Sequence, residues 1–166
     1  MKGNTTMSDE IKLERAQATY RTLCQALDEM ELRYESNDEK LTVFLSVKGD
    51  DFPVELRFRV SPERQLVSLF SQLPFTINES KIVDLALAVS TANYVLANGC
   101  FDFKITSGDI LFRMVNSFDN CELSTDVFKY MTICTVSTVD EYNDKFLLIS
   151  KDVLPLDKFI SDVLEN

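Results

Sequence analysis

Residues 52–60 read FPVELRFRV, and their alternation of apolar and polar side chains constrains the fold more than any other stretch does. Successive side chains of a β-strand point to opposite faces, so a period of two predicts a strand with one buried face. Residues 41–48, LTVFLSVK, alternate in the same way, and Gly49-Asp50-Asp51 supplies a turn between the two runs. Together they predict an antiparallel hairpin whose inner face is apolar and whose outer face contacts water. Flanking strands are expected within residues 32–36 and 65–73.

An apolar stripe at spacings of three and four predicts a helix over residues 9–30, with Ser8 as its N-cap. The stripe consists of Leu13, Ala16, Tyr20, Leu23, Leu27 and Met30. We expect this helix to pack on the chain's own sheet, and a dimer seam is the alternative. Residues 1–8 are expected to form a flexible tail. Residues 9–166 are expected to form a single domain, because 166 residues is an ordinary domain size.

A second helix over residues 80–97 is apolar on more than one side, which predicts a central and nearly enclosed helix. Asn98-Gly99 is expected to end it, with Gly99 in the left-handed C-cap conformation. The alternating residues 100–114 then predict a second hairpin around Ser107-Gly108.

The last quarter of the chain predicts two helices. The spacing of apolar residues favours a helix that begins near Ser124, although TICTVSTV within it could locally form a strand. Pro155 suits the first turn of a closing helix over residues 155–164.

Composition excludes several functions. A net charge of −10 repels phosphate backbones, so nucleic acid is not an expected partner. The absence of histidine removes the usual general base, most zinc sites and every nucleophile that depends on histidine. The four cysteines show no CxxC spacing, and we expect them to be reduced, mostly buried thiols. No signal peptide and no membrane span are apparent, so the expected location is cytoplasmic.

Candidate chemistry is sparse. Asp102 and Asp109 near a hairpin turn, and the loop pair Asp119-Asn120, could indicate carboxylate catalysis or calcium, but turn chemistry explains both. Arg57 and Arg59 could bind an anion, although a solvated strand face is the favoured interpretation. Asn93 is expected to bond across a helix interface rather than to a ligand. We therefore predict no catalytic, cofactor-binding or metal-binding residue.

Residues 65–75, QLVSLFSQLPF, have no polar face. Leu66 and Phe70 lie on one face of the expected strand, while Val67, Leu69 and Leu73 lie on the other. One face should pack on the central helix, and the other also needs a cover, because large exposed apolar patches are uncommon on monomers. The C-terminal helices could supply this cover. A second subunit or a bound peptide is the alternative, which makes Val67, Leu69 and Leu73 a candidate partner-binding or dimer surface.

Three segments carry a resemblance to a known family: ANYVLANG at 92–99, FDFKITSGDILFR at 101–113 and VDEYNDKFLLI at 139–149. In these the chain resembles the YbjN family, labelled as bacterial sensory transduction regulators, whose fold is similar to that of type III secretion chaperones. The resemblance implies an α+β fold in which a bent antiparallel sheet packs against helices. Its implied element order is helix–strands–helix–hairpin–helices, and it implies no catalytic residues.

The resemblance also implies a function. We expect a non-enzymatic protein-binding module, chaperone-like or regulatory, which holds a peptide segment or partner protein and forms a homodimer. The alternative is a small-ligand sensor or enzyme with a pocket between sheet and helices, for which the sequence offers no evident set of convergent polar groups.

Overall fold

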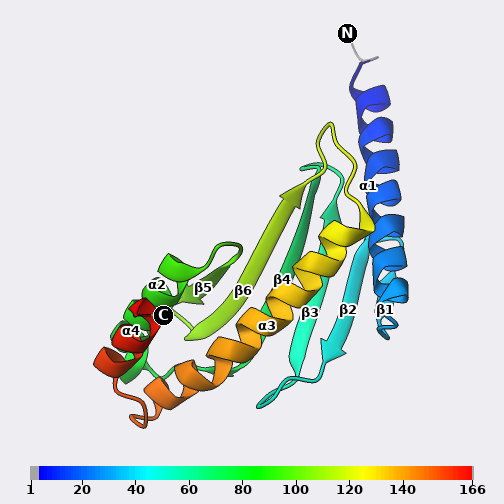
Figure 1. Cartoon of the computed structure of the whole chain (residues 1–166). Helices are drawn as coiled ribbons and strands as arrows, with labels where there is room; N and C mark the ends of the chain where they lie inside the picture. Colours follow the sequence, from blue (N-terminus) through cyan, green and yellow to red (C-terminus); the bar gives the residue numbers. More distant parts are fainter. Residues whose placement is uncertain (1–3, 166) are drawn as a thin grey trace. The chain divides into compact units, whose positions relative to one another are not determined.

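The computed structural model describes the backbone of residues 4–165 and the side chains of residues 9–165. Within residues 4–165, four α-helices and six strands follow one another in the predicted order of helix, strands, helix, hairpin and helices (Figure 1). The helices are α1 (Asn4–Glu29), α2 (Ile82–Val95), α3 (Thr125–Ser150) and α4 (Leu156–Leu164), with a short 3-10 helix η1 (Glu79–Lys81) before α2. The strands are β1 (Glu35–Asn37), β2 (Thr42–Val47), β3 (Val54–Ser61), β4 (Leu66–Thr76), β5 (Cys100–Lys104) and β6 (Asp109–Ser117).

The six strands form one sheet in the order β1-β2-β3-β4-β6-β5. Strand β1 pairs antiparallel with β2, with Glu35 opposite Phe44, and β5 pairs antiparallel with β6, with Cys100 opposite Arg113. The short strands β1 and β5 are therefore the two edges of the sheet. The predicted α+β class with an antiparallel sheet is confirmed.

Strand β3 shows why the alternating pattern was informative. Its even-numbered residues from Val54 to Val60 are buried, and the residues between them, including Arg57 and Arg59, are exposed. Each buried side chain of this kind contributes about 1.5–3 kcal/mol when it leaves water. This burial energy determines which of the two side-chain faces of the strand is turned toward the core.

Contacts group the chain into two compact units, with residues 1–46, 56–69 and 115–133 in the first and the remaining residues in the second. Strands β2, β3, β4 and β6 and helix α3 contribute residues to both units. The predicted single domain over residues 9–166 stays a prediction.

In the first unit, α1 buries its apolar stripe. Ala16, Tyr20, Leu23 and Leu27 are buried there, which favours packing within the chain over the alternative of a dimer seam. Near its end, Glu29 Oε2 lies 2.6 Å from Lys129 Nζ of α3. The helix begins at Asn4, before the predicted Ser8 cap. Residues 1–3 of the predicted tail lie outside the described residues.

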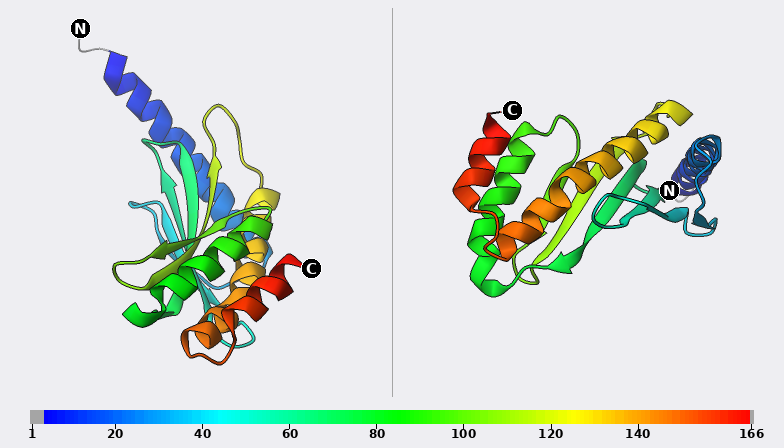
Figure 2. Two further views of the ribbon diagram at one scale, coloured as in Figure 1. Left: turned by 90° about the vertical axis from the view of Figure 1, so that its left-hand side faces the viewer. Right: turned by 60° about the horizontal axis from the view of Figure 1, so that its bottom comes forward.

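In the second unit, α2 is not the central, enclosed helix that the sequence predicts. It packs against α4 and β5, and all three elements lie together in Figures 1 and 2. One stripe is buried, made of Leu85, Ala88, Val89 and Ala92. Apolar residues on its other sides, Val83, Leu87 and Tyr94 among them, are exposed.

The second unit also holds an aromatic cluster. The rings of the cluster lie with centroids between 5.0 and 6.3 Å apart, and they belong to Phe101, Phe112, Tyr142, Phe146 and Phe159. The members on α3 lie on one uninterrupted helix, so the helical interpretation of residues 125–150 is confirmed and the strand alternative is wrong.

Gly99 has a positive φ of 74°, as predicted, but it does not cap α2. The helix ends at Val95, and Leu96 is already extended with ψ of 126°. Gly99 instead lies in the loop before β5, where an added Cβ would collide with Phe112 and Met114. Both backbone conformation and close approach thus require glycine at this position.

Candidate functional site

The predicted surface residues Val67, Leu69 and Leu73 of β4 lie inside the chain. Their side chains are 0%, 0% and 2% exposed, as expected if the chain's own packing covers this strand face. A partner could reach them only if the packing around them opened. Leu66 and Phe70 on the other face are half-buried. A docking role for the three residues stays a prediction.

The most exposed apolar surface on a helix lies on α2. Val83, Leu87 and Tyr94 are 70%, 50% and 82% exposed, and their spacings of four and seven place them on one face of the helix. We call this set the α2 stripe. Exposed large apolar side chains that gather on one element are typical of interaction surfaces.

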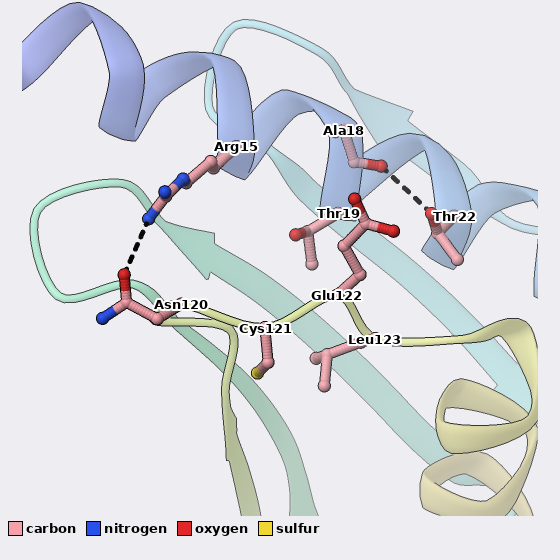
Figure 3. Close-up of a pocket in the computed structure, with 8 residues that line it drawn as sticks. All are labelled: Arg15, Ala18, Thr19, Thr22, Asn120, Cys121, Glu122 and Leu123. Atoms are coloured by element: carbon pink, nitrogen blue, oxygen red, sulfur yellow. Dashed lines mark hydrogen bonds between the residues drawn. The ribbon is translucent and has the colours of Figure 1, made fainter.

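The first unit contains a pocket of about 570 Å³ between α1 and the loop that precedes α3 (Figure 3). Arg15, Ala18, Thr19 and Thr22 line it from the helix, and residues 120–123 line it from the loop. Figure 3 shows Arg15 reaching toward Asn120, with 3.5 Å between Arg15 Nη1 and Asn120 Oδ1. We call it the loop pocket.

The loop pocket does not bring together a catalytic set. Its exposed thiol, Cys121, donates to the carbonyl oxygen of Ser117 at 3.3 Å, and Thr22 donates to the carbonyl of Ala18 at 3.2 Å. Glu122 extends from the loop toward α1 in Figure 3. None of the hydrogen bonds between the described residues joins this thiol to a base that could activate it.

A second groove of the first unit, about 650 Å³ in volume, lies between α1 and the segment that contains edge strand β1. Two tyrosines each donate to an aspartate here: Tyr20 Oη to Asp38 Oδ1 and Tyr34 Oη to Asp28 Oδ1, both at 3.0 Å. The remaining lining residues are Gln17, Arg21, Cys24, Gln25, Ser36 and Leu41. We call it the tyrosine groove.

Burial and hydrogen bonding affect the acids of the tyrosine groove. Burial, together with the hydrogen bond to Asp38, raises the pKa of Tyr20, and burial with the bond to Asp28 does the same to the pKa of Tyr34. Burial also raises the pKa of the Cys24 thiol. The phenols and the thiol therefore remain protonated at neutral pH, and the groove's negative charge resides on the two carboxylates.

The structure places the other sequence candidates in structural roles. Asp102 is in strand β5, where its two oxygens accept from Arg113 Nε at 2.6 Å and Nη2 at 3.1 Å. Asp109 accepts a hydrogen bond from Ser107. Asn93 bonds to the backbone of Phe101, so the prediction that it contacts protein is confirmed, although its partner is a strand.

Arg57 and Arg59 are exposed on β3, and the Arg57 guanidinium lies 5.9 Å from the centroid of the Phe44 ring. This arrangement fits the solvated strand face that the sequence favours.

The cysteines are less buried than predicted. Cys24, Cys100 and Cys134 are half-buried and Cys121 is exposed. Among residues 9–165, no three cysteine, aspartate or glutamate side chains gather closely enough to hold a metal ion. Within the described part of the chain, no helix has the length and apolar character that a membrane crossing requires.

Sequence reasoning missed both the α2 stripe and the tyrosine groove. The stripe was counted as core, because an all-apolar helix predicts burial. The groove depends on pairs such as Tyr20 with Asp38, 18 residues apart, and a turn brings them together. The signal for it in the sequence is the acidic segment that follows α1.

Comparisons with known proteins identify the fold. No protein-family model matches the chain, and no curated protein matches its sequence. The crystal structure of YbjN, "a putative transcription regulator from E. coli", is similar over 81% of this chain and 95% of its own, with a TM-score of 0.56 and 13% identity. The crystal structure of the ExsC-ExsE complex is similar over 75% of this chain and 90% of its own, with a TM-score of 0.51 and 17% identity. The predicted YbjN-like, type III secretion chaperone-like fold is confirmed.

Proposed function

We propose that this chain is a non-enzymatic protein-binding module, chaperone-like or regulatory, that holds a partner protein or peptide segment on the α2 stripe. The observation that carries this proposal is the exposure of Val83, Leu87 and Tyr94 on one helix face. Two similar folds support it, since one belongs to YbjN, "a putative transcription regulator", and the other was solved as the ExsC-ExsE complex.

The energetics favour an occupied stripe. Burying an exposed Val or Leu side chain contributes about 1.5–3 kcal/mol, and a tyrosine adds a large, rigid contact surface. Among the described residues the stripe stays exposed, while α2 packs against α4 and β5. A partner that covers the stripe would recover this energy. The partner can be a second copy, which gives a homodimer, or a different protein.

We place this function in the cytoplasm, where the four unpaired thiols would stay reduced.

A charge introduced into the stripe tests the proposal. Leu87→Asp should leave the chain folded, because the side chain is half exposed, and should abolish the partner complex or the dimer in light scattering. Leu13→Asp is the matched control, since Leu13 is 45% exposed on α1 and receives the same substitution. Equal association in wild type and both variants would rule out the α2 stripe as the interface.

The second candidate function is a small-ligand sensor or enzyme, which the loop pocket and the tyrosine groove favour. Their volumes of about 570 and 650 Å³ fall within the range of ligand sites. Native mass spectrometry of protein purified from its host distinguishes the two functions. A bound small molecule without a protein partner would support the sensor or enzyme.

A further inference from the structure

The loop pocket carries two opposite charges that do not pair with each other. Its α1 wall supplies the guanidinium of Arg15, and its loop wall supplies the carboxylate of Glu122. Among residues 9–165, neither side chain forms an ion pair. Arg15 Nη1 instead donates to the neutral Asn120 Oδ1 at 3.5 Å, which is longer than an ordinary hydrogen bond. Both charges therefore remain available to a ligand.

A buried hydroxyl without a partner lines the same pocket. Thr19 is only 8% exposed, and no hydrogen bond between the described residues involves its side chain. The Ser71 hydroxyl is also unpartnered but is sealed in the core, whereas the Thr19 hydroxyl keeps contact with the pocket. In the view of Figure 3, Thr19 lies between Arg15 and Glu122. A polar ligand can recover the free energy that such an unpaired hydroxyl costs.

Apolar surface completes the lining of the loop pocket. Ala18 lies on the α1 wall, and half-buried Leu123 lies on the loop wall. The volume of about 570 Å³ is within the range of small-molecule sites. The pocket therefore suits a small molecule that has both polar and apolar parts.

The charges of the pocket exclude most classes of ligand. A simple anion would be attracted by Arg15 and repelled by Glu122, and a simple cation would meet the reverse. An apolar molecule would desolvate both charges without pairing either of them. A metal ion fits less well, because the described residues supply no group of three ligands here. A molecule with one positive and one negative group satisfies both walls.

We propose that the loop pocket binds a free α-amino acid with an apolar side chain. Arg15 and the Thr19 hydroxyl donate to its carboxylate, and Glu122 accepts from its ammonium group. An α-amino acid carries both charges at one end, which leaves its side chain free to pack against Ala18 and Leu123. This inference rests on the second candidate function, the small-ligand sensor, and is independent of protein binding on the α2 stripe.

The test titrates the chain with L-leucine in a calorimeter. Two matched molecules each lack one charge: 4-methylpentanoate lacks the ammonium group, and 3-methylbutylamine lacks the carboxylate. A third, 6-aminohexanoate, is an isomer of leucine that keeps both charges but places them at opposite ends. Leucine should bind at least about tenfold more tightly than the first two, because each of them loses a charged hydrogen bond. It should also bind more tightly than its isomer, which has no side chain left for the apolar lining.

The Cys121 thiol gives a second measurement of occupancy. It is exposed and lines the loop pocket, so leucine should slow its alkylation by iodoacetamide. Mass spectrometry of the digested protein distinguishes Cys121 from the other cysteines. Cys24 lines the tyrosine groove instead, so its alkylation rate should not change and serves as the internal control.

Arg15→Gln and Glu122→Gln each remove one charge from an exposed side chain, so the chain should stay folded. Each should weaken leucine binding about tenfold or more, because a charged hydrogen bond contributes about that much. Arg21→Gln and Asp119→Asn are the matched controls. Arg21 lies on the same helix and Asp119 in the same loop, and both are exposed and do not line the pocket. These controls should change binding less than about twofold, as screened surface charges do.

Thr19→Val tests the buried hydroxyl, because valine has a similar shape and no hydroxyl. The substitution should weaken leucine binding about two- to tenfold, as the loss of one neutral hydrogen bond does. It should not lower stability in urea denaturation, since the hydroxyl has no partner among the described residues of the free protein. Unchanged affinity would contradict the role of Thr19.

Several results would overturn the proposal. They are equal binding of leucine and either singly charged analogue, equal or tighter binding of 6-aminohexanoate, equal losses for the pocket variants and their controls, or no protection of Cys121 by leucine.

Native mass spectrometry of protein purified from its host separates this inference from the function on which it rests. If the protein carries a bound small molecule but leucine does not bind, the loop-pocket assignment fails and the second candidate function stands. If no small molecule is bound and leucine does not bind, both fail. Leu87→Asp should leave leucine binding unchanged, because Leu87 lies on α2 and does not line the pocket. Loss of leucine binding in that variant would contradict the independence of the two sites.

Discussion

At the scale of single residues, Gly99 shows how one position can satisfy two constraints. Its φ of 74° lies in the left-handed region, and its α-carbon faces the Phe112 ring closely. The sequence predicts the first constraint from the Asn-Gly pair alone. It could not predict the second, because Phe112 lies on another strand and local sequence carries no information about that approach.

Gly99→Ala should destabilise the protein more than the same substitution at an ordinary glycine helix C-cap would. The positive φ costs about 1 kcal/mol and overpacking against Phe112 adds about 1–3 kcal/mol, so the expected loss is about 2–4 kcal/mol. Urea denaturation monitored by circular dichroism measures it. In a Phe112→Leu background the substitution should cost less, since the colliding ring is gone. An equal cost in both backgrounds would mean that backbone strain and the Met114 contact, and not the Phe112 ring, are responsible.

The tyrosine groove also depends on where single side chains end, as Tyr20 shows. Tyr20 belongs to the apolar stripe of α1, and the sequence correctly places it in the core. Its hydroxyl nevertheless reaches Asp38, beyond the end of the helix and past a turn. A periodicity argument assigns a residue to a face and does not say where the polar tip of a tyrosine ends.

At the scale of elements, edge strand β5 is closed by a side chain. Asn93 Oδ1 accepts the Phe101 N–H at 2.7 Å, and Asn93 Nδ2 donates to the Phe101 carbonyl at 2.9 Å. The amide thus takes the place of a neighbouring strand at this residue. Such protection limits edge-to-edge aggregation.

Asn93→Leu should open this edge and destabilise the protein by about 1–3 kcal/mol, because two backbone groups lose their partner. Asn93→Asp should lie between, since a carboxylate still accepts the N–H but cannot donate to the carbonyl. Amide hydrogen exchange at Phe101 is the direct measurement. Thr91→Val is the control, because the Thr91 hydroxyl bonds within its own helix. Unchanged exchange at Phe101 in Asn93→Leu would contradict the edge role.

The elements differ in how well the sequence predicts them. Strand β3 and helix α3 follow directly from period two and period 3.6, because their patterns match one face each. The prediction that helix α2 is enclosed is wrong. Apolar residues all around a helix indicate burial only if other elements pack on every side of it. In the second unit α2 packs against α4 and β5, and its remaining apolar residues form the exposed α2 stripe, which is the candidate binding surface.

Strand β4 lies where the sequence predicts a strand, but the pattern left the cover of its two faces open. Both of its faces are apolar, so the pattern could not say which face the chain covers. The structure buries Val67, Leu69 and Leu73 and leaves Leu66 and Phe70 half-buried. Covering one face of a sheet depends on helices that are distant in sequence, which a strand's own pattern does not encode.

At the scale of the whole molecule, the acid–base behaviour is unusual because the chain has no histidine. No side chain has an ordinary pKa near neutrality, so stability should be nearly constant between about pH 6 and 8. The alkaline range differs. Burial raises the pKa of the Cys24 and Cys100 thiols and of Tyr20, Tyr34 and Tyr142.

We expect stability to fall as the pH rises above about 9. A raised pKa means that the folded state holds its proton longer than the unfolded state does. The stabilisation is therefore complete below the unfolded pKa, about 9 for the thiols and about 10 for the phenols, and is lost as the pH rises through the folded pKa. Urea denaturation at a series of pH values from 6 to about 11 measures the slope.

The double variant Tyr20→Phe and Tyr34→Phe identifies the groups responsible. Removing each phenol should reduce the alkaline slope by at most about 1.4 kcal/mol per pH unit, the limit for one proton. The variants lose hydrogen bonds as well, so the slope and not the absolute stability is compared. If the double variant retains the wild-type slope above pH 10, Tyr20 and Tyr34 do not control alkaline unfolding, and Cys24, Cys100 and Tyr142 must account for it.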